Sequence, residues 1–257
     1  MESAKPQQKS STSWGKHAEW YEGVVGDIGS YQREVILPNV LRLLELKKGE
    51  DVLDLGCGEG IFAREFYKTG ANVAGVDIAP ELIEAARRKS PPGIIFRIGN
   101  AKTLSSLNDA VFDAAAMILA IQNVDDVNAV CQSVRRVLKG DARFVIVMNH
   151  PVLRAPTLSS WGWDEEKKIQ YRRIDGYMTE AKIPIQMHPG DDPKAVTWSF
   201  HRPLQTYAKA LRNNGFFVDT IEEWTSHKKS EPGLRAKAED AARKEIPLFM
   251  AIKAMAR

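Results

Sequence analysis

The sequence contains little cysteine, no long hydrophobic run and almost no net charge. Its 257 residues include only two cysteines, Cys57 and Cys131, which form no Cys-x-x-Cys pair, so neither a metal site nor a redox dithiol is predicted. Unpaired cysteines are typical of reducing compartments, and we expect a cytoplasmic protein. The longest apolar run, Ala114 to Ile121, has eight residues. A helix that crosses a bilayer needs about 20, so no membrane partner is expected.

The charge balance limits the partners further. The chain carries 36 Lys and Arg against 33 Asp and Glu, a formal net charge of +3, and the two signs are interspersed. Strong nucleic-acid binders usually concentrate basic residues in a stripe, so no stable complex with nucleic acid is expected. Residues 1–13 are polar and predict a disordered tail. The remaining residues, 14–257, are long enough for a single domain with a sizeable core.

Strand-like and helix-like segments alternate through the first part of the chain. Helical periodicity from about Trp14 to Leu46 predicts a helical N-terminal segment. The patterns then predict strands at 51–55, 72–76, 94–98, 112–119 and 144–148, and helices at 61–68, at 80–89, and from Asp125 or Asp126 to a stop at Gly140. This alternation predicts an α/β fold with a doubly wound, mostly parallel sheet.

The alternation stops after the fifth predicted strand. Residues 150–202 are rich in aromatics and interrupted by prolines, and they predict an irregular cap insertion over the edge or mouth of the sheet. The pattern after the insertion predicts a helix at 203–213 and strands at 216–224 and 248–254. We expect these last two strands to form an antiparallel edge pair.

A glycine loop follows the first predicted strand. Gly56 and Gly58 let a ligand approach the backbone closely, because glycine has no Cβ. A dinucleotide site would need a third small residue, but Ile61 is bulky at that position. Asp54 would also place a carboxylate near the phosphates of a dinucleotide. These features favour a cationic ligand without phosphate, and S-adenosylmethionine is such a ligand.

Polar residues also end the next two predicted strands. Asp77 follows the glycine loop by about 20 residues, a spacing at which an acid can accept hydrogen bonds from ribose hydroxyls. Ile78 can pack against an adenine ring. Asn100 and the Ala101 amide can bind the adenine edge. Because parallel strands end at the same edge of a sheet, Asp54, Asp77 and Asn100 are expected to meet there.

Several segments resemble the motifs of class I (Rossmann-like) S-adenosylmethionine-dependent methyltransferases. They are VLDLGCGEG at 52–60, VAGVDIAPELIEAAR at 73–87, GNAKTL at 99–104 (with Asn100 where the family usually has Asp), FDAAAMILAIQNVDD at 112–126 and RRVLKGDARFVIVMNHP at 135–151. The resemblance implies a seven-stranded sheet and methyl transfer from S-adenosylmethionine, and it leaves the acceptor open. The residues expected to bind the cofactor are Tyr21, Asp54, Gly56, Cys57, Gly58, Asp77, Ile78, Asn100, Ala101 and Ala120.

The acceptor is expected beyond the ends of the fourth and fifth strands. His150 ends the fifth strand and is the first candidate for a general base, with His201 as the second. The residues expected to contact the acceptor are Gln122, Asn123, Arg154, Trp161 and Tyr177. Arginines in the insertion can hold a carboxylate or phosphate of the acceptor through two parallel hydrogen bonds.

The leading functional hypothesis is methylation of a small organic molecule, with oxygen as the first choice of acceptor atom. An RNA or protein methyltransferase is the second hypothesis. It is weakened because neither a [DN]PP[YFW] nor a Pro-Cys segment follows the fourth predicted strand. The third hypothesis is a protein that binds S-adenosylmethionine without turnover. A monomer or a homodimer is expected.

Overall fold

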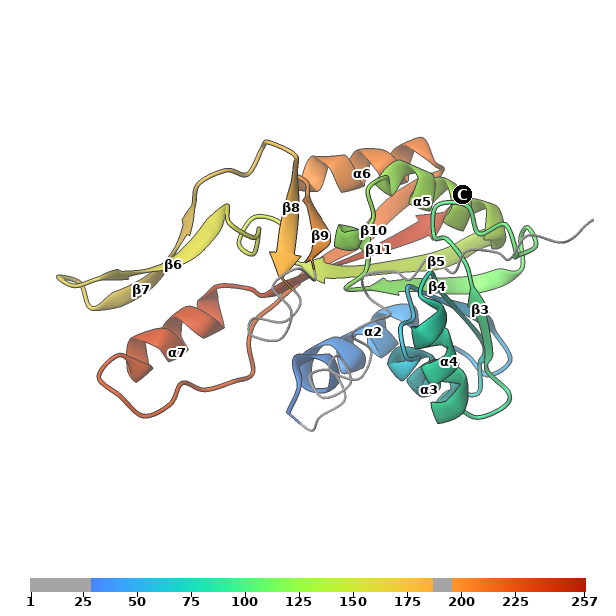
Figure 1. The fold of residues 1–257 in the computed structure, drawn as a ribbon, viewed down its shortest axis with the longest axis horizontal. Helices are drawn as coiled ribbons and strands as arrows, with labels where there is room; N and C mark the ends of the chain where they lie inside the picture. The colour runs from blue at the N-terminus through green and yellow to red at the C-terminus, as the bar shows by residue number, and fades with distance from the viewer. Residues whose placement is uncertain (1–28, 187–195) are drawn as a thin grey trace, which may run out of the picture.

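A seven-stranded β-sheet forms the centre of the fold (Figure 1). The computed structural model describes residues 29–186 and 196–257. The strand order is β10-β11-β5-β4-β1-β2-β3, in which the five strands β1 to β5 are parallel and β11 is antiparallel to both neighbours. These strands are β1 (Asp51–Leu55), β2 (Asn72–Asp77), β3 (Ile95–Ile98), β4 (Phe112–Ile118), β5 (Leu138–Asn149), β10 (Phe216–Trp224) and β11 (Phe249–Ala256). The predicted fold class is confirmed.

Helices cover both faces of this sheet (Figure 1). One face carries α2 (Leu37–Leu44), α3 (Ile61–Lys68) and α4 (Pro80–Lys89), and the other carries α5 (Val127–Val137) and α6 (Leu204–Asn213). A short π-helix, η2 (Gln32–Ile36), leads directly into α2. Their apolar stripes bury large side chains completely, such as Phe66 on one face and Leu211 on the other. None of the helices in the described ranges is both long and apolar enough to cross a membrane.

Most predicted elements lie where the patterns placed them, but β5 is longer than expected. Helix α5 begins after Asp126, whose side chain caps it by accepting from the Ala129 amide, and it ends at Val137. The chain then enters β5 at once, so the predicted helix stop at Gly140 is wrong. Pairing with β4 shifts from Leu138 to Arg143, and Asp141 has a positive φ of 60° inside this irregularity. A bulge therefore absorbs the polar residues before the buried part of the strand.

The cap insertion is more regular than the sequence predicted. It contains two antiparallel hairpins, β6 (Ser159–Asp164) with β7 (Ile169–Ile174) and β8 (Ala181–Gln186) with β9 (Val196–His201). Pro184 lies inside β8, which is possible because each strand of a two-stranded sheet has a free edge. In Figure 1 the β6–β7 hairpin projects beyond the sheet above α7 (Ala236–Glu245), a helix that the pattern did not predict.

The last two strands are antiparallel, as predicted, but only one of them lies at the edge. Strand β11 is inserted between β5 and β10, with Ile252 opposite Ile146 on one side and Ile221 on the other. Its apolar residues are buried from Phe249 to Ile252. The edge strand is β10, whose exposed side chains alternate with buried or half-buried ones from Asp219 to Trp224.

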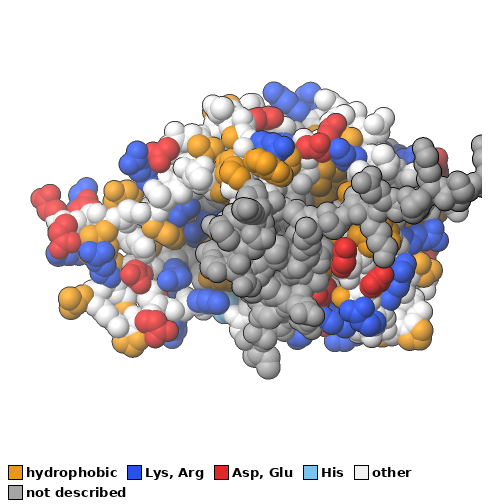
Figure 2. Space-filling model, viewed as in Figure 1, with side chains coloured by type: hydrophobic (Ala, Val, Ile, Leu, Met, Phe, Trp, Pro, Cys, Tyr) orange, Lys and Arg blue, Asp and Glu red, His pale blue; other side chains and the backbone are white. Residues whose placement is uncertain are grey.

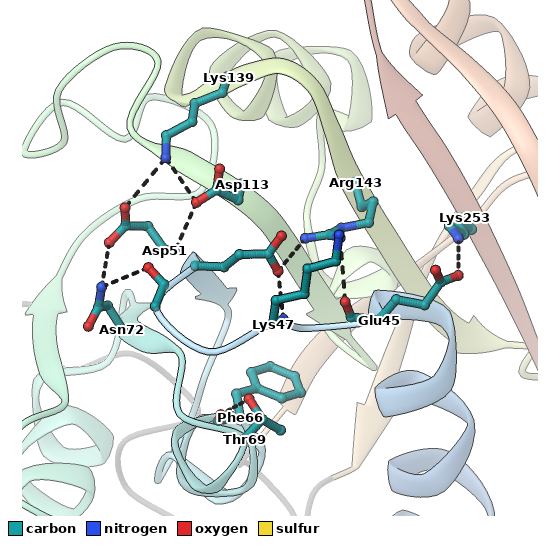
Figure 3. A network of polar contacts seen from close by, with 12 residues as sticks. Glu45, Lys47, Asp51, Phe66, Thr69, Asn72, Asp113, Lys139, Arg143 and Lys253 are labelled. Atoms are coloured by element: carbon teal, nitrogen blue, oxygen red, sulfur yellow. Dashed lines mark hydrogen bonds and ion pairs between the residues drawn. The ribbon is translucent and has the colours of Figure 1, made fainter.

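A polar network closes the amino-terminal end of the parallel strands (Figure 3). Lys139 approaches Asp113 at 2.9 Å and Asp51 at 3.5 Å, so it links the beginnings of β4 and β1. Arg143 pairs with Glu50 at 2.7 Å just before β1. These contacts tie the strands together at their amino-terminal end, whereas ligands of open α/β sheets bind at the opposite, carboxyl-terminal end.

Candidate active site

A cleft of about 280 Å³ opens at the carboxyl ends of β1, β2 and β4. Most of the residues predicted to bind the cofactor line it, and Asn123 from the predicted acceptor contacts does so as well. The lining residues are Gly56, Gly58, Val76, Asp77, Ile78, Leu82, Gly99, Asn100, Ala101, Lys102, Met117, Ile118, Leu119, Ala120, Asn123, Val124 and Asp125. The structure therefore brings together groups that are up to about 70 positions apart in sequence.

The glycine loop turns sharply between β1 and α3. Gly56 and Gly58 have φ of +70° and +53°, in the left-handed region that glycine adopts without strain. A Cβ at Gly56 would lie 2.6 Å from the Cβ of Ala120, which is closer than two carbon atoms can approach. The Gly56 amide donates to the Val76 carbonyl at 2.8 Å and so ties the loop to β2. The glycines are therefore needed for both the turn and the width of the cleft.

Asp77 is held in a fixed orientation at the end of β2. Its Oδ2 accepts from the Gly58 amide and its Oδ1 from the Ala79 amide, both at 2.9 Å. Burial raises the pKa of Asp77, and these amides act in the opposite direction. Each carboxylate oxygen can accept a further hydrogen bond, so both remain available to the neighbouring hydroxyls of a ribose.

Asp54 lies behind the glycine loop and is not among the residues that line the cleft. Its side chain is almost fully buried, and Oδ2 has no hydrogen-bond partner. Burial raises the pKa of Asp54 to about 7; the charge of Asp77 contributes in the same direction, whereas the Ala63 amide opposes it. A buried carboxylate oxygen without a partner fits a cationic donor such as the ammonium of S-adenosylmethionine.

The outer wall of the cleft holds its polar groups in place. Asn100 Oδ1 accepts from the Lys102 amide at 2.9 Å, and Lys102 Nζ pairs with Asp125 at 2.8 Å. This ion pair was not predicted, because a strand separates its partners in the sequence. Ile78 is 51% exposed, which is high for an apolar residue and leaves its side chain free to pack against a flat ring.

Cys57 and Gln122 lie beside the cleft and do not line it. Cys57 is buried, and burial raises the pKa of its thiol well above the usual range, so it is not a nucleophile in this arrangement. Gln122 Nε2 donates to the Leu119 carbonyl at 2.9 Å, while its Oε1 is buried without a partner. Leu119 itself has φ of +53°, a strained conformation for leucine at the end of β4.

His150 uses both ring nitrogens for contacts within the protein. Its Nδ1 accepts from the Leu153 amide at 3.3 Å, so the proton lies on Nε2, which approaches Glu223 at 2.6 Å. The ring is buried and does not line the cleft. This geometry fixes the loop after β5 and leaves neither nitrogen available to an acceptor.

His201, at the end of β9, is as buried as His150 and does not line the cleft either, but its ring nitrogens have different partners. Its Nε2 donates to the Tyr177 carbonyl at 2.8 Å, and in the described part of the chain no hydrogen bond engages Nδ1. The next residue, Arg202, donates to the carbonyls of Val124 and Asp125 at 2.7 and 2.6 Å. Both of these residues line the cleft, so the β8–β9 hairpin is attached to its wall.

The remaining predicted acceptor contacts belong to the insertion. The Tyr177 hydroxyl accepts from the Leu204 amide at 2.8 Å and so holds the hairpin against α6. Arg154 stacks on Trp161, with the guanidinium carbon 5.0 Å from the ring centroid. Tyr21, predicted to reach the cofactor, lies outside the described residues. Within the described ranges no three His, Cys, Asp or Glu side chains gather closely enough to hold a metal ion.

The fold and the cleft define the class as a Rossmann-like protein that binds a nucleoside-containing cofactor. A family model described as a methyltransferase domain matches residues 53–146. The solved structure of an S-adenosylmethionine-dependent methyltransferase from Mesorhizobium loti is 28% identical, covers 85% of this chain and 96% of that chain, and superimposes with a TM-score of 0.68. The matched domain and the shared fold support a class I S-adenosylmethionine-dependent methyltransferase, with S-adenosylmethionine as the cofactor.

Two relatives of known function share the cofactor half of the chain. A demethylmenaquinone methyltransferase from Tropheryma whipplei is 34% identical over 113 residues, which cover 43% of this chain and 46% of the relative. A ubiquinone biosynthesis O-methyltransferase from Xanthomonas oryzae pv. oryzae is 31% identical over 105 residues, 39% of this chain and 44% of the relative. The chain therefore spans less than half the length of these relatives.

Proposed function

We propose that the protein transfers a methyl group from S-adenosylmethionine to a small organic acceptor, with oxygen as the receiving atom. The observation that carries this proposal is the attachment of the cap to the cleft. Arg202 ties the β8–β9 hairpin to the carbonyls of Val124 and Asp125 in the cleft wall. An insertion attached in this way can enclose a small acceptor next to the cofactor. The names of the two relatives, a demethylmenaquinone methyltransferase and a ubiquinone biosynthesis O-methyltransferase, agree with this class of substrate.

The residues of the cleft fit the cofactor in separate ways. Asp77 would accept from the ribose hydroxyls, Asp54 from the ammonium, and Asn100 with the Ala101 amide would contact the adenine edge. The bound cofactor supplies an electrophilic methyl group on its sulfonium. The protein then accelerates transfer chiefly by holding the acceptor atom in line with that methyl group.

An oxygen acceptor must lose its proton, and His201 is the better placed of the two predicted bases. The Tyr177 carbonyl holds its proton on Nε2, so Nδ1 carries the lone pair. The hairpin that carries His201 is attached to the cleft wall by the next residue, whereas His150 faces Glu223. We propose that His201 receives the proton and that Asn123 helps to orient the acceptor.

Methylation of a nucleic acid is the weaker alternative to methylation of a small molecule. Figure 2 shows acidic and basic side chains interspersed over the coloured part of this face, without a continuous basic stripe. The cytoplasmic location and the monomeric or dimeric state expected from the sequence remain proposals.

The full chain should be incubated with methyl-labelled S-adenosylmethionine and with three substrate pools: small phenols and acids, total RNA, and a protein extract. We expect label to be transferred only to the small molecules, with Asp77→Ala as the control that loses cofactor binding. Label on RNA or protein alone would support the second hypothesis. Tight binding of S-adenosylhomocysteine without any transfer would support a binding protein that does not turn over.

A further inference from the structure

Arg154 carries an unpaired charge close to the carboxyl end of the sheet. Its amide donates to the His150 carbonyl at 2.8 Å, which fixes its place just after β5. Its Nε is buried without a hydrogen-bond partner, and no carboxylate in the described ranges forms an ion pair with the guanidinium. Strand β4, whose continuation lines the cleft, is the direct neighbour of β5. A guanidinium left in this state is stabilised by any anion that reaches it.

A second arginine holds the surroundings of Arg154 in place. Arg172 lies 5.2 Å from the centroid of the same Trp161 ring that Arg154 stacks on. Arg172 Nε donates to the Leu153 carbonyl at 2.6 Å and its NH2 group to Ser159 Oγ at 2.8 Å. These bonds fix Arg172 and, through it, the tryptophan. Arg154 is therefore positioned by stacking, while within residues 29–186 and 196–257 its side chain donates no hydrogen bond.

The charged neighbours of Arg154 are mainly positive. Burial lowers the pKa of Arg154 to about 10, with Arg172 on β7 and Arg243 on α7 acting in the same direction and Tyr31 opposing them. The carboxylate of Glu223, which pairs with His150, is not among the groups that act on Arg154. The region is thus partly desolvated and carries excess positive charge, which is the combination that favours binding of an anion.

We propose that Arg154 binds an anionic group of the acceptor, a carboxylate or a phosphate, at the side of the insertion that faces the end of β5. This inference rests on the proposed function, because it specifies the class of acceptor. The planar guanidinium can donate two parallel hydrogen bonds to either oxyanion, and Trp161 keeps its plane fixed. A neutral acceptor would leave the buried Nε unsatisfied.

The test uses the full chain saturated with S-adenosylhomocysteine, and thermal unfolding as the readout. Sodium phosphate and sodium benzoate are compared with sodium chloride at equal ionic strength. We expect one of the two anions to raise Tm of the wild type, and the effective one identifies phosphate or carboxylate as the preferred group. Arg154→Gln should weaken the apparent affinity for that anion at least about tenfold. Arg173→Gln is the matched control, because Arg173 is 67% exposed and pairs with Asp175.

Two outcomes would overturn the proposal: neither anion stabilises the wild type beyond chloride, or Arg154→Gln responds like the wild type. If Arg154→Gln does not fold, Arg154→Lys replaces it, since lysine keeps the charge but loses the planar fork. An unchanged anion affinity in Arg154→Lys would then refute the bidentate contact. Stabilisation by S-adenosylhomocysteine alone is measured in the same samples, so its absence would count against the proposed function, separately from Arg154.

Discussion

Replacing Asp54 with asparagine should show how much the buried carboxyl group lowers the free energy of unfolding. Asparagine keeps the shape of the side chain but cannot ionise. Burial raises the pKa of Asp54 from 3.8 to about 7. At about 1.4 kcal/mol per pH unit, this difference corresponds to about 4 kcal/mol. Between these two values the folded chain holds a proton that the unfolded chain has released, so stability falls as the pH rises through this window.

The expected result is a stability difference that grows with pH. The free energy of unfolding of Asp54→Asn should match that of the wild type near about pH 4 and exceed it by up to about 4 kcal/mol near about pH 8. Urea unfolding over this range measures both proteins, and their difference isolates Asp54 from the other titrating groups. A difference in unfolding free energy that stays constant across this pH range would refute a buried Asp54 carboxyl group with a raised pKa.

The affinity for the cofactor should depend on pH in the opposite direction to stability, because it should fall as the pH is lowered. If the Asp54 carboxylate receives the ammonium, the wild type must release a proton to bind at a pH below about 7. Its affinity for S-adenosylhomocysteine should then fall up to about tenfold per pH unit below that value. Asp54→Asn should show no such slope and should bind about tenfold to a hundredfold more weakly near about pH 8, the range for losing a charged hydrogen bond. Parallel pH profiles in calorimetry would show that Asp54 does not contact the ammonium.

Five further substitutions test the rest of the site. Asp77→Ala should weaken binding of S-adenosylhomocysteine by about 1–3 kcal/mol, and an unchanged Kd in a folded variant would contradict the ribose contact. Gly56→Ala should lose about 1–3 kcal/mol of stability, because φ is +70° and the new Cβ would lie 2.6 Å from the Cβ of Ala120. Adding Ala120→Gly should restore only part of this loss. A melting temperature of Gly56→Ala like that of the wild type would contradict the clash. His201→Gln should lower turnover by about 10²–10⁴-fold with little change in cofactor affinity, whereas His150→Gln should mainly lower stability, and the reverse pattern would return the base to His150.

The cofactor half could be predicted because its signals are local. Gly56 and Gly58 lie between a strand and a helix that are each recognisable from a few residues, and Asp77 ends the next strand. Parallel strands then bring these positions together without any further information. Seven of the ten predicted cofactor residues line the cleft for this reason.

The position of the insertion could be predicted, but its contacts could not, because they join distant positions. The bond from Arg202 to Val124 spans 78 residues, and the pair of His150 with Glu223 spans 73. The place of His150 at the end of a strand suggested a general base. Only the position of β10 in the structure shows that Glu223 contacts its Nε2. Pro184 also obscured the β8–β9 hairpin, since a proline inside a strand usually argues against that strand.

The insertion of β11 between β5 and β10 has a consequence for how the chain reaches its native state. The parallel strands β1 to β5 all lie within residues 51–149, whereas β11 pairs Phe249 with Asn149, a hundred positions earlier. Contacts between such distant segments form late, because a long loop must close before they contribute any energy. In the native sheet β11 covers this edge of β5. In any intermediate that precedes docking of β11, the same edge is exposed to water and to other chains. The pairing of β11 with β5 should therefore limit the folding rate, and the strands that form the cofactor cleft should pair before it.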